Sequence, residues 1–302
     1  MGVSMNTPRL RPYAILAILL LVTAVNGQSS PQDAPPQPQP SPTPSLEKKF
    51  LANILRDQRA IWTAPFSLRR SDGKWLVPLG VASSILFATD RHTSGELFEG
   101  SNHGTRLRIS RDFSRLGSGY ASASVAAVFY VVGRSKHDLR ARETGLLGAE
   151  ALLDSAIVVT ALKTISQRQR PPVDHASGEF FDGGSSFPSG HAISAWALAT
   201  VIDHEYGRRH PLVRYGAYGL ATAVSLSRYT GTNHFLSDVV IGSALGYGIG
   251  RYVYSQHHDS SLDLGTPTKK KKSITQSKFF PQIAPGYSRR GHRYGAVLTW
   301  AL

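Results

Sequence analysis

The sequence predicts an all-α protein, built as a helical bundle of about six to seven core helices. Three observations favour this class. Apolar residues between positions 46 and 255 recur in stretches of helical length, many of these stretches are rich in Ala, Gly and Ser, and no segment in the range is a confident strand. A chain of 302 residues is long enough to bury a substantial core. The expected helices lie near 46–60, 76–90, 109–133, 140–169, 190–206, 211–227 and 235–255.

The first 27 residues have the pattern of a secretory signal peptide. Arg9 and Arg11 precede an apolar stretch from Tyr13 to Val25, and small residues stand before Gln28. The alternative is an N-terminal anchor that is not cleaved, although the apolar run is short for a membrane span. The chain has no cysteine, which excludes disulfides and a lipoprotein anchor.

The rest of the chain divides into three parts by composition. Residues 28–45 are rich in Pro, Gln and Ser, so they cannot bury a core and we expect an extended linker. Residues 46–258 form the expected helical domain. Residues 259–302 form a basic C-terminal tail, in which positions 294–302 look strand-like without an evident pairing partner.

The charge of the chain is concentrated in this tail. The net charge is +14, and residues 264–302 contain eight Lys and Arg but no Asp or Glu. A segment of this kind, over residues 269–293, suits peripheral contact with an anionic membrane surface, and a solvated tail is the simpler alternative. Nucleic-acid binding is not expected, because the basic residues are not interleaved with a stacking platform or a reader motif.

Hydropathy favours a periplasmic or exported domain over an integral inner-membrane protein, which is the alternative. The best apolar runs are Leu76–Thr89, Tyr120–Val132, Ala156–Leu162 and Val239–Ile249, all shorter than the 18 or so residues of a spanning helix. The mean hydropathy of −0.17 also fits a water-soluble chain better than one of six spans.

The first of three polar motifs is Lys163-x6-Arg170-Pro171. On a helix that reaches residue 169, seven positions are almost two turns, so the two cations would project from one face about 10 Å apart along the axis. Two long cations in this arrangement can close on one anion. Pro171 and Pro172 cannot continue a helix and would end it near Arg170.

The second motif, Pro188-Ser189-Gly190-His191, precedes an apolar, Ala-rich run through Ile202. Ser189 is expected near the N-cap of a helix, where unpaired N–H groups can bind an anion. Gly190 lets a phosphoryl oxygen approach the backbone, and His191 is placed to donate a proton.

The third motif runs from Ser227 to Asp238 and contains Arg228, Gly231 and His234. His234 and Asp238 are four residues apart. A carboxylate beside one imidazole nitrogen fixes the tautomer and leaves the other nitrogen free as a nucleophile. Each motif alone has a plain alternative as solvated charges, a helix cap or a surface hydrogen bond, but all three occur in order within residues 163–238.

The three motifs together resemble those of the type 2 phosphatidic acid phosphatases, which share a fold with class A bacterial acid phosphatases and vanadium-dependent haloperoxidases. The resemblance covers about residues 75–255, and Gly231 stands one place earlier than in commoner members. It implies that His234 attacks phosphorus, His191 protonates the leaving group and Asp238 orients His234. It also implies a phosphate cradle of five residues: Lys163, Arg170, Ser189, Gly190 and Arg228.

The expected function is therefore a metal-independent phosphatase that hydrolyses phosphate monoesters or lipid (di)phosphates through a phospho-histidine. No cofactor and no metal are required, because three cations can neutralise the phosphoryl oxygens. The partner would be a phosphorylated small molecule or lipid. Two alternatives stay open: a vanadium-dependent haloperoxidase, and a non-catalytic phosphate- or lipid-binding envelope protein.

Overall fold

The computed structural model describes residues 46–67, 70–99, 103–171, 178–263, 282–288 and 293–299. Contacts along the chain divide it into two units, Met1–His258 and Asp259–Leu302. The described part of the first unit is helical, which confirms the all-α bundle. Its main helices are α2 (Leu46–Thr63), α3 (Gly73–Glu99), α4 (His103–Leu116), α5 (Gly119–Ser135), α6 (Leu139–Ser166), α7 (Gly190–Ile202), α8 (Pro211–Thr230) and α9 (Leu236–His257).

The second unit contains a short 3₁₀ helix, η5 (Ser260–Asp263), and a hairpin of two antiparallel strands, β1 (Gln282–Ser288) and β2 (Arg293–Thr299). Gln282 pairs with Thr299, and Ser288 pairs with Arg293. The strand-like C-terminal segment thus has β1 as its partner. The expected signal peptide and linker lie outside the described residues, and the domain limits as a whole stay predictions.

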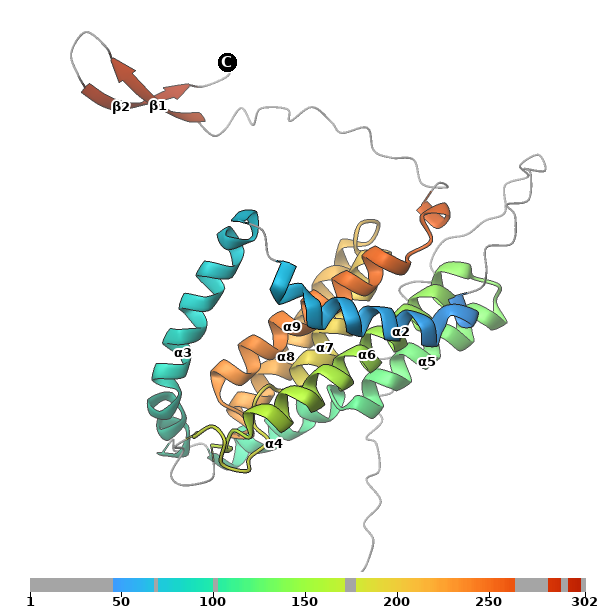
Figure 1. Cartoon of the computed structure of the whole chain (residues 1–302), viewed down its shortest axis with the longest axis horizontal. Coiled ribbons are helices and arrows are strands. Elements are labelled where there is room, and N and C mark those ends of the chain that lie inside the picture. The colour runs from blue at the N-terminus through green and yellow to red at the C-terminus, as the bar shows by residue number, and fades with distance from the viewer. Residues whose placement is uncertain are drawn as a thin grey trace, which may run out of the picture. The chain divides into compact units, whose positions relative to one another are not determined.

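Helix α7 forms the centre of the bundle, in contact with α5, α6, α8 and α9 (Figure 1). Ile193, Ala197 and Val201 are fully buried on it. Opposite them, Gly246 and Gly250 of α9 leave no room for a side chain, because a Cβ at either position would lie within 2.4 Å of a backbone oxygen of α7. This close packing fixes the N-terminus of α7 next to the N-terminus of α9, and both of these helix ends carry motif residues.

Several helix limits differ from the sequence expectation. The expected helix 76–90 continues to Glu99 as α3. The expected helix 109–133 is broken after Leu116, where Ser118 caps α5 by accepting a hydrogen bond from the Ala121 N–H at 3.2 Å. The expected helix 140–169 ends at Ser166, because Gln167 takes a left-handed conformation with φ of 43°. Arg170 therefore lies beyond the helix, and the expectation that Lys163 and Arg170 project from one helical face was wrong.

One described helix, α6, is long and apolar enough to cross a membrane. An 18-residue stretch of it has a mean hydropathy of 1.7, and 44% of that stretch is buried inside the protein. The apolar run Ala156–Leu162 is much shorter than α6, because the helix continues through isolated acidic residues on its N-terminal side. Helices α4 and α5 pass the same test only as a pair bent by 40°. One or two such helices are weak evidence for a membrane span, because the core helix of a soluble protein passes the same test.

Candidate active site

The loop that follows α6 folds back on the helix and brings the two cations of the first motif together. The amide of Gly184 donates to the Gln167 carbonyl at 2.9 Å, and the amide of Ser186 donates to the Arg168 carbonyl at 2.8 Å. Lys163, on the last turn of α6, donates from Nζ to the carbonyl of Ser185 in this loop. Arg170 lies 3.4 Å from the hydroxyl of the same residue. The cations thus meet at Ser185 through the loop rather than along a helix.

The second motif lies at the start of α7, as expected from the sequence. Ser189 is the N-cap residue, and its hydroxyl is buried without a hydrogen-bond partner among the described residues. A Cβ at Gly190 would make only an ordinary contact, 3.6 Å from Val159, so the protein itself leaves space above this backbone. A helix N-terminus with a spare hydroxyl and an open backbone suits an anion. His191 occupies the second position of the helix.

The third motif spans the turn between α8 and α9. Arg228 lies in the last turn of α8 and donates to the hydroxyl of Ser114 on α4. The His234 amide donates back to the Arg228 carbonyl at 3.2 Å, which holds His234 beside the end of α8. The Ser189 amide donates to the Asp238 carbonyl at 3.1 Å, and this bond joins the second motif to the third.

A buried carboxylate, that of Asp238, lies beside His234. Its Nδ1 lies 3.7 Å from Asp238 Oδ2, which is longer than a hydrogen bond, and 3.5 Å from the Ser186 hydroxyl. Ser186 in turn donates to Asp238 Oδ2, and the Phe235 amide donates to the same oxygen at 3.0 Å. Because Nδ1 faces this group, Nε2 is the nitrogen that remains for chemistry.

The charges of the three motifs act on one another. Burial lowers the pKa of His191 to about 4, and Arg228, His234, Lys163 and Arg170 all contribute to the decrease. Burial also lowers the pKa of His234 to about 4, although Asp238 opposes this. Cations and imidazoles from separate parts of the chain thus share one site, where both imidazoles are neutral at pH 7.

The cations are affected in the same way. Burial, followed by the charge of Arg170, lowers the pKa of Lys163 to about 8 and that of Arg228 to about 10. Burial raises the pKa of Asp238, but His234, Arg168 and Ser186 outweigh burial and hold the pKa below its usual value. Crowded cations, hydroxyls and backbone N–H groups are donors, so this site is suited to an anion.

Comparison with known proteins agrees with the motifs. Residues 144–262 match the sequence model of the PAP2 superfamily. The matched segment includes all three motifs, from Lys163 to Asp238.

Two curated proteins to which this chain is similar are phosphatases by name. The chain is 39% identical over 70 residues to a lipid A 1-phosphatase of Porphyromonas gingivalis, covering 23% of this chain and 16% of that protein. It is 39% identical over 119 residues to a decaprenylphosphoryl-5-phosphoribose phosphatase of Mycobacterium tuberculosis, covering 38% and 62%. The chain thus spans less than two thirds of the length of either relative.

Two solved structures are similar to this chain. Aquifex aeolicus LpxE has a TM-score of 0.43 and 22% identity, covering 53% of this chain and 92% of that one. A transmembrane PAP2 type phosphatidylglycerolphosphate phosphatase from Bacillus subtilis has a TM-score of 0.44 and 20% identity, covering 69% and 94%.

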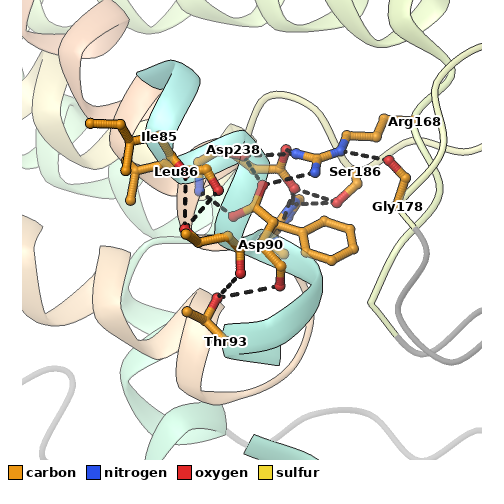
Figure 2. A network of polar contacts seen from close by, with 12 residues as sticks. Ile85, Leu86, Asp90, Thr93, Arg168, Gly178, Ser186 and Asp238 are labelled. Carbon is orange, nitrogen blue, oxygen red and sulfur yellow. Dashed lines mark hydrogen bonds and ion pairs between the residues drawn. The ribbon is translucent and has the colours of Figure 1, made fainter. Parts of the chain in front are cut away.

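The candidate site also contains a buried ion-pair network that sequence reasoning missed (Figure 2). Arg168, 3% exposed, donates to Asp238 at 2.7 Å and to Asp90 of α3 at 2.8 Å. Ser237 links Arg168 to Asp90, since its hydroxyl accepts from Arg168 at 2.8 Å and its amide donates to Asp90 at 3.1 Å. The carboxylate beside His234 is therefore itself held by Arg168.

Aromatic rings enclose this guanidinium. The rings of Phe87, Phe180 and Phe235 have their centroids 5.1, 4.9 and 4.2 Å from Arg168 Cζ, within cation–π range. Phe180 is thus part of this packing, although it is 39% exposed. Its neighbour Phe181 is 76% exposed. Glu179 and Asp182 of the same loop are exposed as well.

Proposed function

We propose that this protein is a phosphatase that cleaves phosphate monoesters or lipid (di)phosphates in two steps. The observation that carries the proposal is the meeting of Lys163, Arg170, Arg228 and His234 around His191, with Asp238 behind His234. Phosphoryl transfer needs mainly positioning and neutralisation of charge on the phosphoryl oxygens. The site supplies three cations for this purpose without a metal ion.

In the first step, Nε2 of His234 attacks phosphorus as the P–O bond to the leaving group breaks, and His191 gives a proton to the departing oxygen. In the second step, water attacks the phospho-histidine as His191 takes a proton from it, and phosphate leaves. Asp238 stabilises the charge on the His234 ring while it carries the phosphoryl group. A bound phosphate dianion offsets the cations that lower the pKa of His191, so it favours the protonated form needed in the first step.

A phosphorylated lipid is the substrate class that we favour over soluble esters. Both named relatives are phosphatases of lipid phosphates by their printed names. Helix α3 also exposes apolar side chains, among them Val77, Val81 and Ile85. Such a surface supports a membrane-associated position, which we place at the periplasmic or exported side of the membrane.

The direct test is hydrolysis of an aryl phosphate and of lipid phosphates by the purified chain, in detergent and with excess EDTA. We expect activity with the chelator and strong inhibition by orthovanadate, which resembles the five-coordinate transition state. Loss of activity in EDTA that a divalent cation restores would contradict the mechanism. Bromide oxidation in the presence of vanadate and peroxide would instead identify a haloperoxidase, and no turnover of either kind would indicate a binding protein.

A further inference from the structure

A second group of buried polar residues lies between α2, α6 and α9, outside the site described above. It consists of Asp57 of α2, Glu150 and Asp154 of α6, and His257 of α9, and we call it the Asp57 cluster. His257 Nε2 lies 3.0 Å from both carboxylate oxygens of Asp57 and 3.7 Å from Glu150 Oε1. Three helices thus direct ionisable groups to one point.

The Asp57 cluster has more negative than positive charge. Asp57 and Asp154 are completely buried and Glu150 is 2% exposed, so three carboxyl groups face a single imidazole. Their other neighbours include the neutral side chains Asn53 on Glu150, Gln58 on Asp154 and Tyr252 on Asp57. The charge of exposed Arg56 acts on His257 from the cluster's edge. Buried charges of one sign are costly unless a partner of the opposite sign neutralises them.

Two oxygens of the cluster lack a hydrogen-bond donor. Glu150 Oε1 and Asp154 Oδ2 are both buried, and neither has a hydrogen-bond partner among the described residues. Glu150 Oε1 faces His257, and Asp154 acts on Asp57. Buried carboxylate oxygens without hydrogen-bond donors are acceptors for a ligand that carries positive charge.

A neighbouring cluster shows that the fold can balance such charges with its own residues. Glu143 lies about two helical turns before Glu150 on α6. Glu143 and Glu205 both face His258, whose Nδ1 lies 3.2 Å from Glu143 and 3.3 Å from Glu205. There Arg140 adds a second cation, 3.1 Å from Glu205. Two carboxylates thus meet two groups that can be positive. The Asp57 cluster has no equivalent of Arg140 among its described contacts.

We propose that the Asp57 cluster binds a divalent transition-metal ion of the Mn²⁺ or Zn²⁺ class, with Asp57, Glu150 and His257 as ligands and Asp154 beside them. Ligand atoms of the three residues lie within 4.8 Å of one another. Tetrahedral or cis donors at about 2.0–2.2 Å from an ion stand about 3.0–3.6 Å apart, so shifts of about an ångström close the site. One imidazole with several carboxylates suits these ions.

The role of this ion is structural, because it lies far from the proposed chemistry. Glu150 precedes Lys163 by 13 residues, which is about 20 Å along α6, and His257 follows Asp238 by 19 residues, about 28 Å along α9. Metal binding at the cluster joins α2 to the end of the bundle opposite the phosphate cradle. This agrees with a hydrolytic step that needs no metal.

The test is metal binding by the purified full-length chain, after treatment with a chelator and its removal. Titration calorimetry with MnCl₂ and with ZnCl₂ should give one ion per chain for at least one of them, and the same ion should raise the melting temperature. The Glu150→Gln and His257→Gln variants should each bind at least tenfold more weakly. X-ray absorption of the bound ion should detect one imidazole nitrogen among oxygen ligands.

Asp203→Asn is the matched control, because Asp203 is also a buried carboxylate but pairs with Arg214 at 2.6 Å away from the cluster. It should bind the ion as the wild type does. Two variants are used so that a folding failure of one still leaves the other as a test. Absence of stoichiometric binding by either ion, or equal weakening in Asp203→Asn and the cluster variants, would overturn the proposal and leave protons as the counter-charge.

Discussion

His191 and His234 have similar surroundings but different expected roles, and the difference lies in the group behind each ring. His234 has Asp238 and Ser186 at its Nδ1, whereas the charges that act on His191 are Arg228, His234, Lys163 and Arg170. A carboxylate behind the ring stabilises the positive phospho-imidazole, which a nucleophile must become. Cations around the ring make His191 ready to release a proton to a leaving group once phosphate is bound.

This difference predicts that the two alanine variants respond differently to the leaving group. His234→Ala should lose at least about 10³-fold in kcat with every substrate, because no phospho-enzyme can form. His191→Ala should lose about 10²–10⁴-fold with an alkyl phosphate but much less with an aryl phosphate, whose phenolate departs without a proton. Steady-state kinetics with the two ester classes measures this. An equal loss on both esters in His191→Ala would remove its assignment as the acid.

The pKa of Lys163 predicts the pH above which substrate binding weakens. Its pKa is lowered to about 8, so its positive charge is complete below pH 8 and is lost as the pH rises through this value. KM for a phosphate ester should therefore increase above pH 8, by up to about tenfold per pH unit. In Lys163→Arg the guanidinium keeps its charge, and the limit should move toward pH 10, where Arg228 titrates. Identical profiles for the two enzymes would contradict this role of Lys163.

Among the helices, α3 is tied to the site through buried charges. Asp90 is 2% exposed, and it reaches Arg168 and Ser237 across 78 and 147 residues of sequence. Arg168 thus serves two carboxylates, Asp90 on α3 and Asp238 on α9. If it is removed, two negative charges stay buried side by side, whereas loss of Asp90 leaves one cation with one carboxylate.

The number of buried charges left without a partner predicts the order of stability among variants. Arg168→Leu should destabilise the protein by about 3–5 kcal/mol, the cost of leaving buried charges without a partner. Asp90→Asn keeps the shape and one balanced pair, so it should cost less, on the order of 1–3 kcal/mol. Thermal unfolding of the purified variants gives the order. A greater loss of stability in Asp90→Asn than in Arg168→Leu would show that Arg168 is not the hub of the network.

The same elements show what local sequence can and cannot predict. The helix that begins after Ser189 and the approximate positions of α8 and α9 follow from apolar runs and capping residues, which act over a few positions. The end of α6 does not, because the left-handed Gln167 is stabilised by a loop that returns to its carbonyl from Gly184. Asp90 carries no local signal at all. Its importance depends on a guanidinium that only folding brings within 2.8 Å.

For the whole molecule, positive charge occurs in two separate groups, one at the candidate site and one in the C-terminal tail. The cations of the site, Lys163, Arg170 and Arg228, belong to the first unit, and Lys269–Lys272 belong to the second. A basic segment attracts an anionic surface by about 1 kcal/mol per residue within a Debye length, whatever the fold around it. Soluble substrates do not require this attraction, whereas substrates in an anionic membrane gain from it.

Replacement of Lys269–Lys272 by Gln tests this separation. Binding to vesicles that contain anionic lipid should weaken by about 10²-fold or more at low salt, because four charges are lost, and the difference should shrink as salt increases. KM and kcat for a soluble aryl phosphate should stay at wild-type values, since the cradle is unchanged. Zwitterionic vesicles in a sedimentation assay are the control, on which both proteins should bind alike. If the variant and the wild type bind anionic vesicles equally, apolar side chains such as those of α3 hold the protein at the membrane instead.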